Sequence, residues 1–201
     1  MILVTQRLLE QQYNHVARKY KIHVKETMPL DLKHLCGCPV CGCVVAPLKQ
    51  QTTSGLPLIS AKMCKKYHIH KPSILINKSL SNYNKLTTLF HEGGHIDCWQ
   101  RHCFCMTCNI KSFQELHAMI FSLQMLMQIG SSTSDRSLIS EMSDLHQHSI
   151  GNGYYKHKEH AIAAQMLKRS KVWKKLSKYL SDKSGSLAPT NKRLLKKMLK
   201  S

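Results

Sequence analysis

Five consecutive residues, His91-Glu92-Gly93-Gly94-His95, have the types and spacing of a catalytic zinc site. On a helix, residues four apart lie on one face, so the two imidazoles can reach the same metal ion. The glutamate between them can reach a water molecule at that ion and act as a general base. The pattern therefore predicts two zinc ligands, His91 and His95, and a catalytic base, Glu92.

The neighbouring residues predict the elements that would position this pattern. Ser73-Ile-Leu-Ile-Asn-Lys78 is typical of a short β-strand. The next segment carries apolar residues at helical spacing, namely Leu86, Leu89, Phe90, Ile96 and Trp99. Each glycine inside a helix costs about 1 kcal/mol relative to alanine, so Gly93 and Gly94 indicate close approach of another element. The chain has 13 histidines, so the motif could also arise by chance. In that alternative interpretation, His91 and His95 only pack against other residues or face solvent.

A zinc site of this kind needs a third protein ligand. Metzincins place a histidine six residues after the second motif histidine, but Arg101 stands there and His102 is one residue out of register. The other arrangement takes a glutamate from a second helix, and Glu115 opens an apolar helical segment. Glu115 could instead form a capping box with Ser112, satisfying a backbone N–H at the helix start. The scarcity of other acids after His95 favours Glu115 as the ligand.

These residues together resemble the ImmA/IrrE family of zinc metallopeptidases. That family has a strand ending near an asparagine, a helix with H-E-x-G-H, and a second helix with E-x-x-A-x-x-F-A. The resemblance covers about residues 73 to 127 and rests on Asn77, His91, Glu92, Gly94, His95, Glu115, Ala118 and Phe121. Two positions depart from the pattern, since Gly93 stands where leucine is usual and Ser122 replaces an alanine.

The resemblance implies a zincin-like fold. It also implies an enzyme that hydrolyses a peptide bond in a protein substrate. It assigns the catalytic zinc to His91, His95 and Glu115 and the role of base to Glu92. Members of the family are associated with regulated cleavage of repressor-like DNA-binding proteins in mobile elements, phages and stress responses. A further donor must stabilise the tetrahedral oxyanion, and the candidates are His102, His117, Tyr154 and Tyr155.

Eight of the nine cysteines fall in two bursts, at residues 36–43 and 98–108. Cys38-Pro-Val-Cys41-Gly has the sequence of a zinc knuckle, in which the spacing turns both thiolates toward one metal. The second burst contains a matching C-x2-C, Cys105 and Cys108. We therefore expect a structural zinc ion on these four thiolates.

The other four cysteines of the bursts, Cys36, Cys43, Cys98 and Cys103, would form a second structural zinc site or two disulfides. The first residues are too short an apolar run for a signal peptide, and no segment has the roughly 18 apolar residues of a membrane span. This predicts a cytoplasmic protein, in the host cytoplasm or a virion if phage-encoded, where thiols stay reduced and zinc is favoured. Free buried cysteines and an iron–sulfur cluster are the alternatives, and we expect Cys64 to be a packing residue.

The composition, 42% hydrophobic residues in 23.0 kDa, predicts a folded protein of the α+β class with one main domain. We expect a mostly helical zincin-like domain with a small β-sheet over residues 1–130, a helical extension over 131–181 and a basic tail over 182–201. The expected helices are 5–20, 83–97, 113–128, 137–148, 158–180 and 191–200. Strands are expected at 21–26 and within 58–78, a loop at 27–57 and a turn at 130–134.

Positive charge is concentrated at the C-terminus. Residues 156–201 contain 14 lysines and arginines against Glu159 and Asp182, which places +12 of the formal +19 there. Such a balance favours DNA or RNA as a partner, with a solvated lysine-rich face as the alternative. The expected contacts are Lys168, Arg169, Lys174, Lys175, Lys192, Arg193, Lys196 and Lys197. The expected helix 158–180, which precedes the basic tail, would have Ile162 and Met166 on its apolar side.

The preferred prediction is a zinc-dependent metallopeptidase, with one catalytic and one or two structural zinc ions, that could act near nucleic acid. The alternative is a non-catalytic, zinc-stabilised nucleic-acid-binding or virion-associated protein on a peptidase-like scaffold. Glu92 discriminates between the two, because a scaffold has no need of a carboxylate beside two histidines.

Overall fold

The structure is a computed structural model of the 201-residue chain. It describes residues 4–37, 42–47, 58–101 and 111–133, together with positions 162, 163, 165, 166 and 169. The chain divides into two compact units, with the boundary between Ile110 and Lys111. The first unit contains a β-sheet and helices α1 to α4, and the second contains helix α6.

The sheet of the first unit has four strands in the order β1-β4-β2-β3. Their bounds are β1 His23–Thr27, β2 Gly42–Pro47, β3 Leu58–Ile59 and β4 Ser73–Asn77. Strand β1 runs parallel to β4 with Thr27 opposite Asn77, whereas β2 is antiparallel to β4 and parallel to β3. Helices beside a small mixed sheet confirm the prediction of the α+β class.

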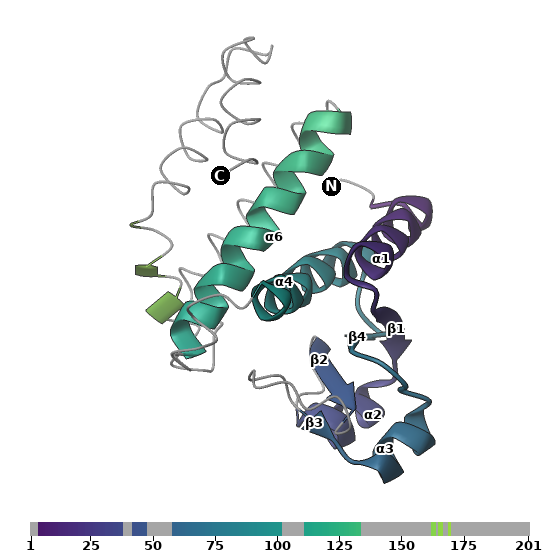
Figure 1. The fold of residues 1–201 in the computed structure, drawn as a ribbon. Helices are drawn as coiled ribbons and strands as arrows, with labels where there is room; N and C mark the ends of the chain where they lie inside the picture. Colours follow the sequence, from purple (N-terminus) through teal and green to yellow (C-terminus); the bar gives the residue numbers. More distant parts are fainter. Residues whose placement is uncertain are drawn as a thin grey trace, which may run out of the picture. The chain divides into compact units, whose positions relative to one another are not determined.

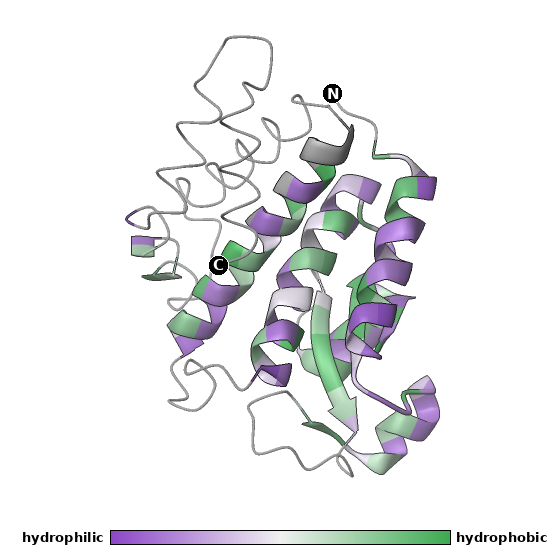
Figure 2. Cartoon of the chain, turned by 45° about the horizontal axis from the view of Figure 1, so that its top comes forward, coloured by the Kyte–Doolittle hydropathy of each residue, from purple (hydrophilic) through white to green (hydrophobic). Residues whose placement is uncertain are grey.

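Helices cover both faces of this sheet (Figure 1). Their bounds are α1 Gln6–Tyr20, α2 Pro29–Cys36, α3 Ala61–Tyr67 and α4 Asn82–Gln100. Helices α1 and α4 pack on one face, and α2 packs on the other around Cys43, Val45 and Leu75. Because side chains alternate along a strand, covering both faces buries every residue of β4. Figure 2 shows the strands in mainly hydrophobic colours, whereas α1 carries hydrophilic residues along its length.

The ends of α1 and α4 follow from local side-chain chemistry. The Thr5 hydroxyl accepts a hydrogen bond from the Leu8 N–H at the start of α1, and Ser81 does the same for Asn84 at the start of α4. Lys21 ends α1 in the left-handed conformation, with φ 53°. The predictions of a helix from about Thr5 to Tyr20 and a strand directly after it are confirmed.

The expected loop at residues 27–57 was wrong, because this range contains α2 and β2. Helix α2 begins with Pro29 and is followed by Gly37, which has φ 76°. Proline at the first position of a helix and glycine just after its last are both common. Helix α3 was also not predicted within 58–78, although the Ser60 hydroxyl caps it by accepting from the Met63 N–H. Both helices are short, so neither offers a long periodic pattern.

Helix α6, Lys111–Thr133, is the principal described element of the second unit. Its buried side chains recur at helical spacing and include Ala118, Phe121, Met125 and Ile129. The expected turn at 130–134 was wrong in that the helix continues to Thr133. Further along the chain, Ala163 is fully buried and Ile162 is 40% exposed.

Two polar contacts, Tyr20–Asp97 and Lys85–Glu26, anchor α4 inside the first unit. The Tyr20 hydroxyl donates to Asp97 Oδ1 at 2.8 Å, and Arg101 Nε donates to the same carboxylate at 3.0 Å. Near the other end of the helix, Lys85 Nζ lies 2.8 Å from Glu26 Oε2. Asp97 and Lys85 are only 3% and 8% exposed, and a buried charge needs such a partner.

Gly42, the first residue of β2, fits against α4 without room for a side chain. A Cβ atom at this position would lie 2.5 Å from the Leu75 carbonyl oxygen and 2.7 Å from Thr88 Cγ2. Glycine therefore allows close packing of the cysteine-rich segment against the helix that carries the histidine motif.

We predict that Tyr20→Phe lowers the free energy of unfolding by about 1–3 kcal/mol, because buried Asp97 loses a donor. Burial first, and the hydrogen bond to Asp97 second, raise the pKa of Tyr20 above its ordinary value. The neutral phenol is thus favoured in the fold, so its contribution is full below about pH 10 and is lost as the pH rises. Urea unfolding at about pH 7 and pH 11 checks both statements. A variant as stable as the parent at neutral pH would contradict this role, and Tyr13→Phe, at a longer hydrogen bond, is the control.

Candidate metal centre

The histidine motif lies on α4, as predicted. The His91 and His95 rings are half-buried and one turn apart, with centroids 5.0 Å from each other and planes at 87°. Glu92, which directly follows His91 in the chain, is 9% exposed. Two imidazoles and a nearly buried carboxylate therefore share one stretch of α4.

The helix that carries this stretch is largely buried. Leu86, Leu89, Phe90 and Ile96 are all completely buried, which confirms the predicted apolar face. Gly93 and Gly94 are buried too, so the two positions of poor helix propensity lie where packing is close. Packing of this density fixes the helix and hence the Cα positions of the histidines.

His91, His95 and Glu115 form a group that could hold a metal ion. Each residue offers one ligand atom, and these three atoms lie within 4.8 Å of one another. All three side chains are half-buried, and Glu115 Oε2 is a buried atom. The third ligand expected from the sequence is therefore grouped with the two motif histidines.

The start of α6 bears on the capping-box alternative for Glu115. In that motif Ser112 would be the N-cap residue, immediately before the first helical residue. The helix begins at Lys111, so Ser112 lies within its first turn. Ser112 is therefore a helical residue of α6 and does not stand at the N-cap position that the capping box requires.

The donor set suits zinc. Two imidazole nitrogens and one carboxylate oxygen are the protein ligands of many catalytic zinc sites, which leave a fourth position for water or substrate. Asp97, on the same helix, is held by Tyr20 and Arg101 and does not belong to the group.

Four of the nine cysteines lie within the described residues. The sulfur atoms of Cys36 and Cys43 form a close pair, with Cα atoms 6.6 Å apart. Cys98 is fully buried on α4. Cys64 packs against the core cluster around α2, as expected of a packing residue, and its thiol lies 3.7 Å from the Ile59 carbonyl oxygen.

The remaining cysteines, Cys38, Cys41, Cys103, Cys105 and Cys108, lie outside the described residues. The four-thiolate zinc site on Cys38, Cys41, Cys105 and Cys108 therefore remains a prediction. Cys36 and Cys43 are two of the four cysteines expected to form a second zinc site or two disulfides, and they lie close together. The choice between a disulfide and a second zinc site stays open.

Most of the expected nucleic-acid contacts also lie outside the described residues. These are Lys168, Lys174, Lys175, Lys192, Arg193, Lys196 and Lys197. Arg169 is described, and it is helical and exposed. Of the four candidate oxyanion donors, only His117, half-buried on α6, is described. Among the helices that the structure describes, none combines the length and hydropathy needed to span a membrane.

Ser122, which departs from the family pattern, is fully buried on α6. Within the part of the chain that the structure describes, its hydroxyl has no hydrogen-bond partner. An alanine at this position would avoid burying an unsatisfied hydroxyl. The departure therefore has an energetic cost without altering any member of the metal-binding group.

Comparison of the chain with family models, curated proteins and solved structures finds nothing that matches. The resemblance to the ImmA/IrrE family accordingly rests on the motif residues, and the metal site rests on their geometry.

We predict that the double variant His91→Ala/His95→Ala binds one metal ion fewer per chain than the parent protein, because two of three grouped ligand atoms are removed. Elemental analysis after dialysis against zinc and then metal-free buffer measures this difference. His70→Ala, at an exposed histidine outside the group, is the matched control. An unchanged metal content in the double variant would refute the site.

Proposed function

We propose that the protein is a zinc-dependent metallopeptidase that hydrolyses a peptide bond in a protein substrate. The observation that carries the proposal is the group formed by His91 and His95 of α4 with Glu115 of α6, together with Glu92 on α4 between the two histidines. The two histidines and Glu115 would account for metal binding, but not for hydrolysis. A carboxylate adjacent to them in sequence adds the base that hydrolysis requires.

Each residue then has a distinct role. His91, His95 and Glu115 would hold zinc, which when bound supplies Lewis-acid chemistry for water and for the scissile carbonyl. Glu92 takes a proton from the attacking water and delivers it to the departing amine, so the products are a carboxylic acid and an amine. The near burial of Glu92 restricts its rotamers and holds its carboxylate ready for this transfer.

Glu92→Gln is expected to keep the metal content of the parent while reducing peptidase activity about 100-fold or more. Glutamine preserves the shape of the side chain and removes its capacity to accept a proton. The assay is cleavage of a proteome-derived peptide library by zinc-loaded protein, read by mass spectrometry. Glu10→Gln, on the exposed side of α1, is the control.

Two results would contradict this function. One is cleavage by the Glu92→Gln variant at the parent rate, which would assign the base to another residue. The other is an intact library after incubation with the fully zinc-loaded parent protein.

We also propose that the basic C-terminal region binds nucleic acid. The supporting observation is the concentration of charge, since residues 156–201 carry 14 lysines and arginines and two acids. Lysine and arginine contacts to phosphates release counterions, which makes such binding strong at low salt and weak at high salt. This activity is compatible with the peptidase and would also remain in a non-catalytic scaffold.

Replacing Lys192, Arg193, Lys196 and Lys197 with glutamate should weaken binding to a labelled duplex and reduce its salt dependence. Fluorescence anisotropy over a series of salt concentrations measures both quantities. The control replaces Lys62, Lys65 and Lys66, which are exposed lysines on α3. Equal losses in the two variants would indicate that net charge alone, and not the C-terminal region, attracts the duplex.

A further inference from the structure

The start of helix α2 exposes two large apolar side chains to solvent. Met28, directly before the helix, is 54% exposed, and Leu30, in its first turn, is 64% exposed. They are the two most exposed large hydrophobic residues in the part of the chain that the structure describes. A single exposed apolar residue is ordinary on a protein surface, so the neighbours of this pair decide what it does.

The nearest charged neighbours of the apolar pair include two lysines. Lys33 follows Leu30 by one turn of α2 and is exposed. Lys78, also exposed, lies beside the residues that end β1, because its backbone N–H donates to the Thr27 carbonyl oxygen at 2.9 Å. Both lysines therefore border Met28 and Leu30.

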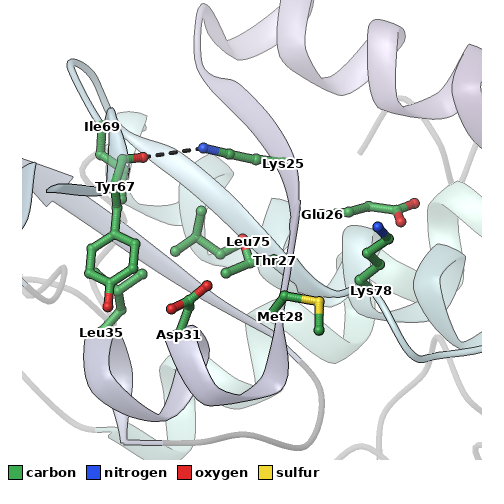
Figure 3. A pocket seen from close by; sticks show the side chains of 10 residues that line it. All are labelled: Lys25, Glu26, Thr27, Met28, Asp31, Leu35, Tyr67, Ile69, Leu75 and Lys78. Carbon is green, nitrogen blue, oxygen red and sulfur yellow. Dashed lines mark hydrogen bonds between the residues drawn. The ribbon is translucent and has the colours of Figure 1, made fainter.

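A cavity of about 200 Å³ connects this group with the end of α3 (Figure 3). Met28, Lys78, Lys25 and Tyr67 all line it. Lys25 Nζ donates to the Tyr67 carbonyl oxygen at 3.2 Å, and Lys66 Nζ lies 5.0 Å from the Tyr67 ring centroid. These contacts join four lysines and the apolar pair into one surface. We call it the lysine-rich surface, and its residues are Lys25, Met28, Leu30, Lys33, Lys66 and Lys78.

Few acids compensate the charge of the lysine-rich surface. Residues 32–91 contain eight lysines and no aspartate or glutamate. Glu26, which lines the cavity, is already paired with Lys85 Nζ at 2.8 Å. Asp31, half-buried in the first turn of α2, is the other acid of the lining. The lysine-rich surface is therefore positive and attracts an anionic partner.

The kind of positive charge indicates the kind of partner. No arginine stands between Arg18 and Arg101. Arginine recognises phosphates and carboxylates through paired hydrogen bonds, and lysine is depleted at interfaces between proteins. Lysines near a membrane act as separate point charges whose attractions to anionic lipids add up. Exposed methionine and leucine side chains add apolar area that can enter a bilayer, whereas a nucleic-acid backbone offers them only charged phosphates.

We propose that the lysine-rich surface binds an anionic membrane surface. Met28 and Leu30 enter the boundary between lipid headgroups and acyl chains, and the four lysines lie against the anionic headgroups. Such binding is peripheral and reversible, since it rests on a small apolar area and on charge attraction that salt weakens. The inference does not depend on the peptidase function.

Vesicle sedimentation with the full-length protein tests the proposal. Mixed vesicles of phosphatidylcholine and phosphatidylserine are compared with vesicles of phosphatidylcholine alone, at physiological salt. We expect binding to the mixed vesicles and much weaker binding to the neutral ones. Binding that is equal for both vesicles, or absent from both, overturns the proposal.

The basic C-terminal region is a second possible source of attraction to anionic lipids. The sedimentation is therefore repeated with the variant in which Lys192, Arg193, Lys196 and Lys197 are replaced with glutamate. We expect this variant to keep binding the mixed vesicles through the lysine-rich surface. Complete loss of binding would assign the lipid contact to the C-terminal region and overturn the proposal.

Substitution of the apolar pair tests the contact with the bilayer. Met28→Ser/Leu30→Ser should weaken binding to the mixed vesicles about tenfold or more, because less apolar area leaves water. Leu58→Ser, at an exposed leucine on β3, the edge strand opposite β1, is the control. Equal effects of the two changes overturn the proposal. So does a loss of duplex DNA binding in Met28→Ser/Leu30→Ser as large as the loss of vesicle binding, which would make nucleic acid the partner.

Substitution of the bordering lysines tests the charge contribution separately. Lys33→Glu/Lys78→Glu should weaken binding to the mixed vesicles about tenfold or more. Arg7→Glu/Arg18→Glu, at exposed residues of α1, changes the net charge equally and is the control. Equal losses in the two variants would show that net charge alone attracts the protein, which overturns the assignment to this surface. All the changed side chains are exposed, so thermal unfolding should match that of the parent.

Discussion

Helix α4 is buried on almost every side, yet it must carry charged and polar groups. Its two buried charged residues outside the histidine motif are each matched by a partner from an earlier element, Lys85 by Glu26 and Asp97 by Tyr20. These contacts join α4 to β1 and α1, and the strand that precedes the helix is buried on both faces. The motif therefore stands on a helix whose position is set by packing and by satisfied polar groups. This is what a metal-binding group needs, since ligand atoms must hold their places before the ion arrives.

The candidate metal centre consists of few residues. Two imidazoles one turn apart and a glutamate are grouped closely enough to hold an ion, and a further carboxylate precedes the second histidine by three residues. A group of residues that could hold a metal ion is the broader finding, and hydrolysis is the narrower proposal that Glu92 adds. The cysteines belong to a different kind of chemistry, in which sulfur stabilises the fold through zinc or through a disulfide. The Cys36 and Cys43 pair lies where α2 ends and β2 begins, so it would fasten these two elements together.

The residues of the candidate metal group were easier to find in the sequence than the elements around them. His91, His95 and Glu115 could be found because zinc chemistry restricts residue type and spacing, and α1 and α4 because they carry long helical patterns. Helices α2 and α3 were missed because eight and seven residues give too little periodicity. The cavity lined by Thr27, Asp31 and Tyr67 among others (Figure 3) could not be predicted, since its residues come from separate elements and none has an unusual local pattern. Such a cavity exists only through tertiary packing.

The contact at Gly42 limits how this protein can change over time. Any side chain there would meet the Leu75 carbonyl oxygen and Thr88, and Thr88 precedes His91 by one turn. Because the nearer of these atoms belongs to the backbone, the collision cannot be relieved by a new rotamer. Relief would require the strand or the helix to shift, and a shift of the helix would carry His91 with it. Position 42 is therefore expected to accept few replacements during evolution, even though Gly42 itself has no chemical role at the metal centre.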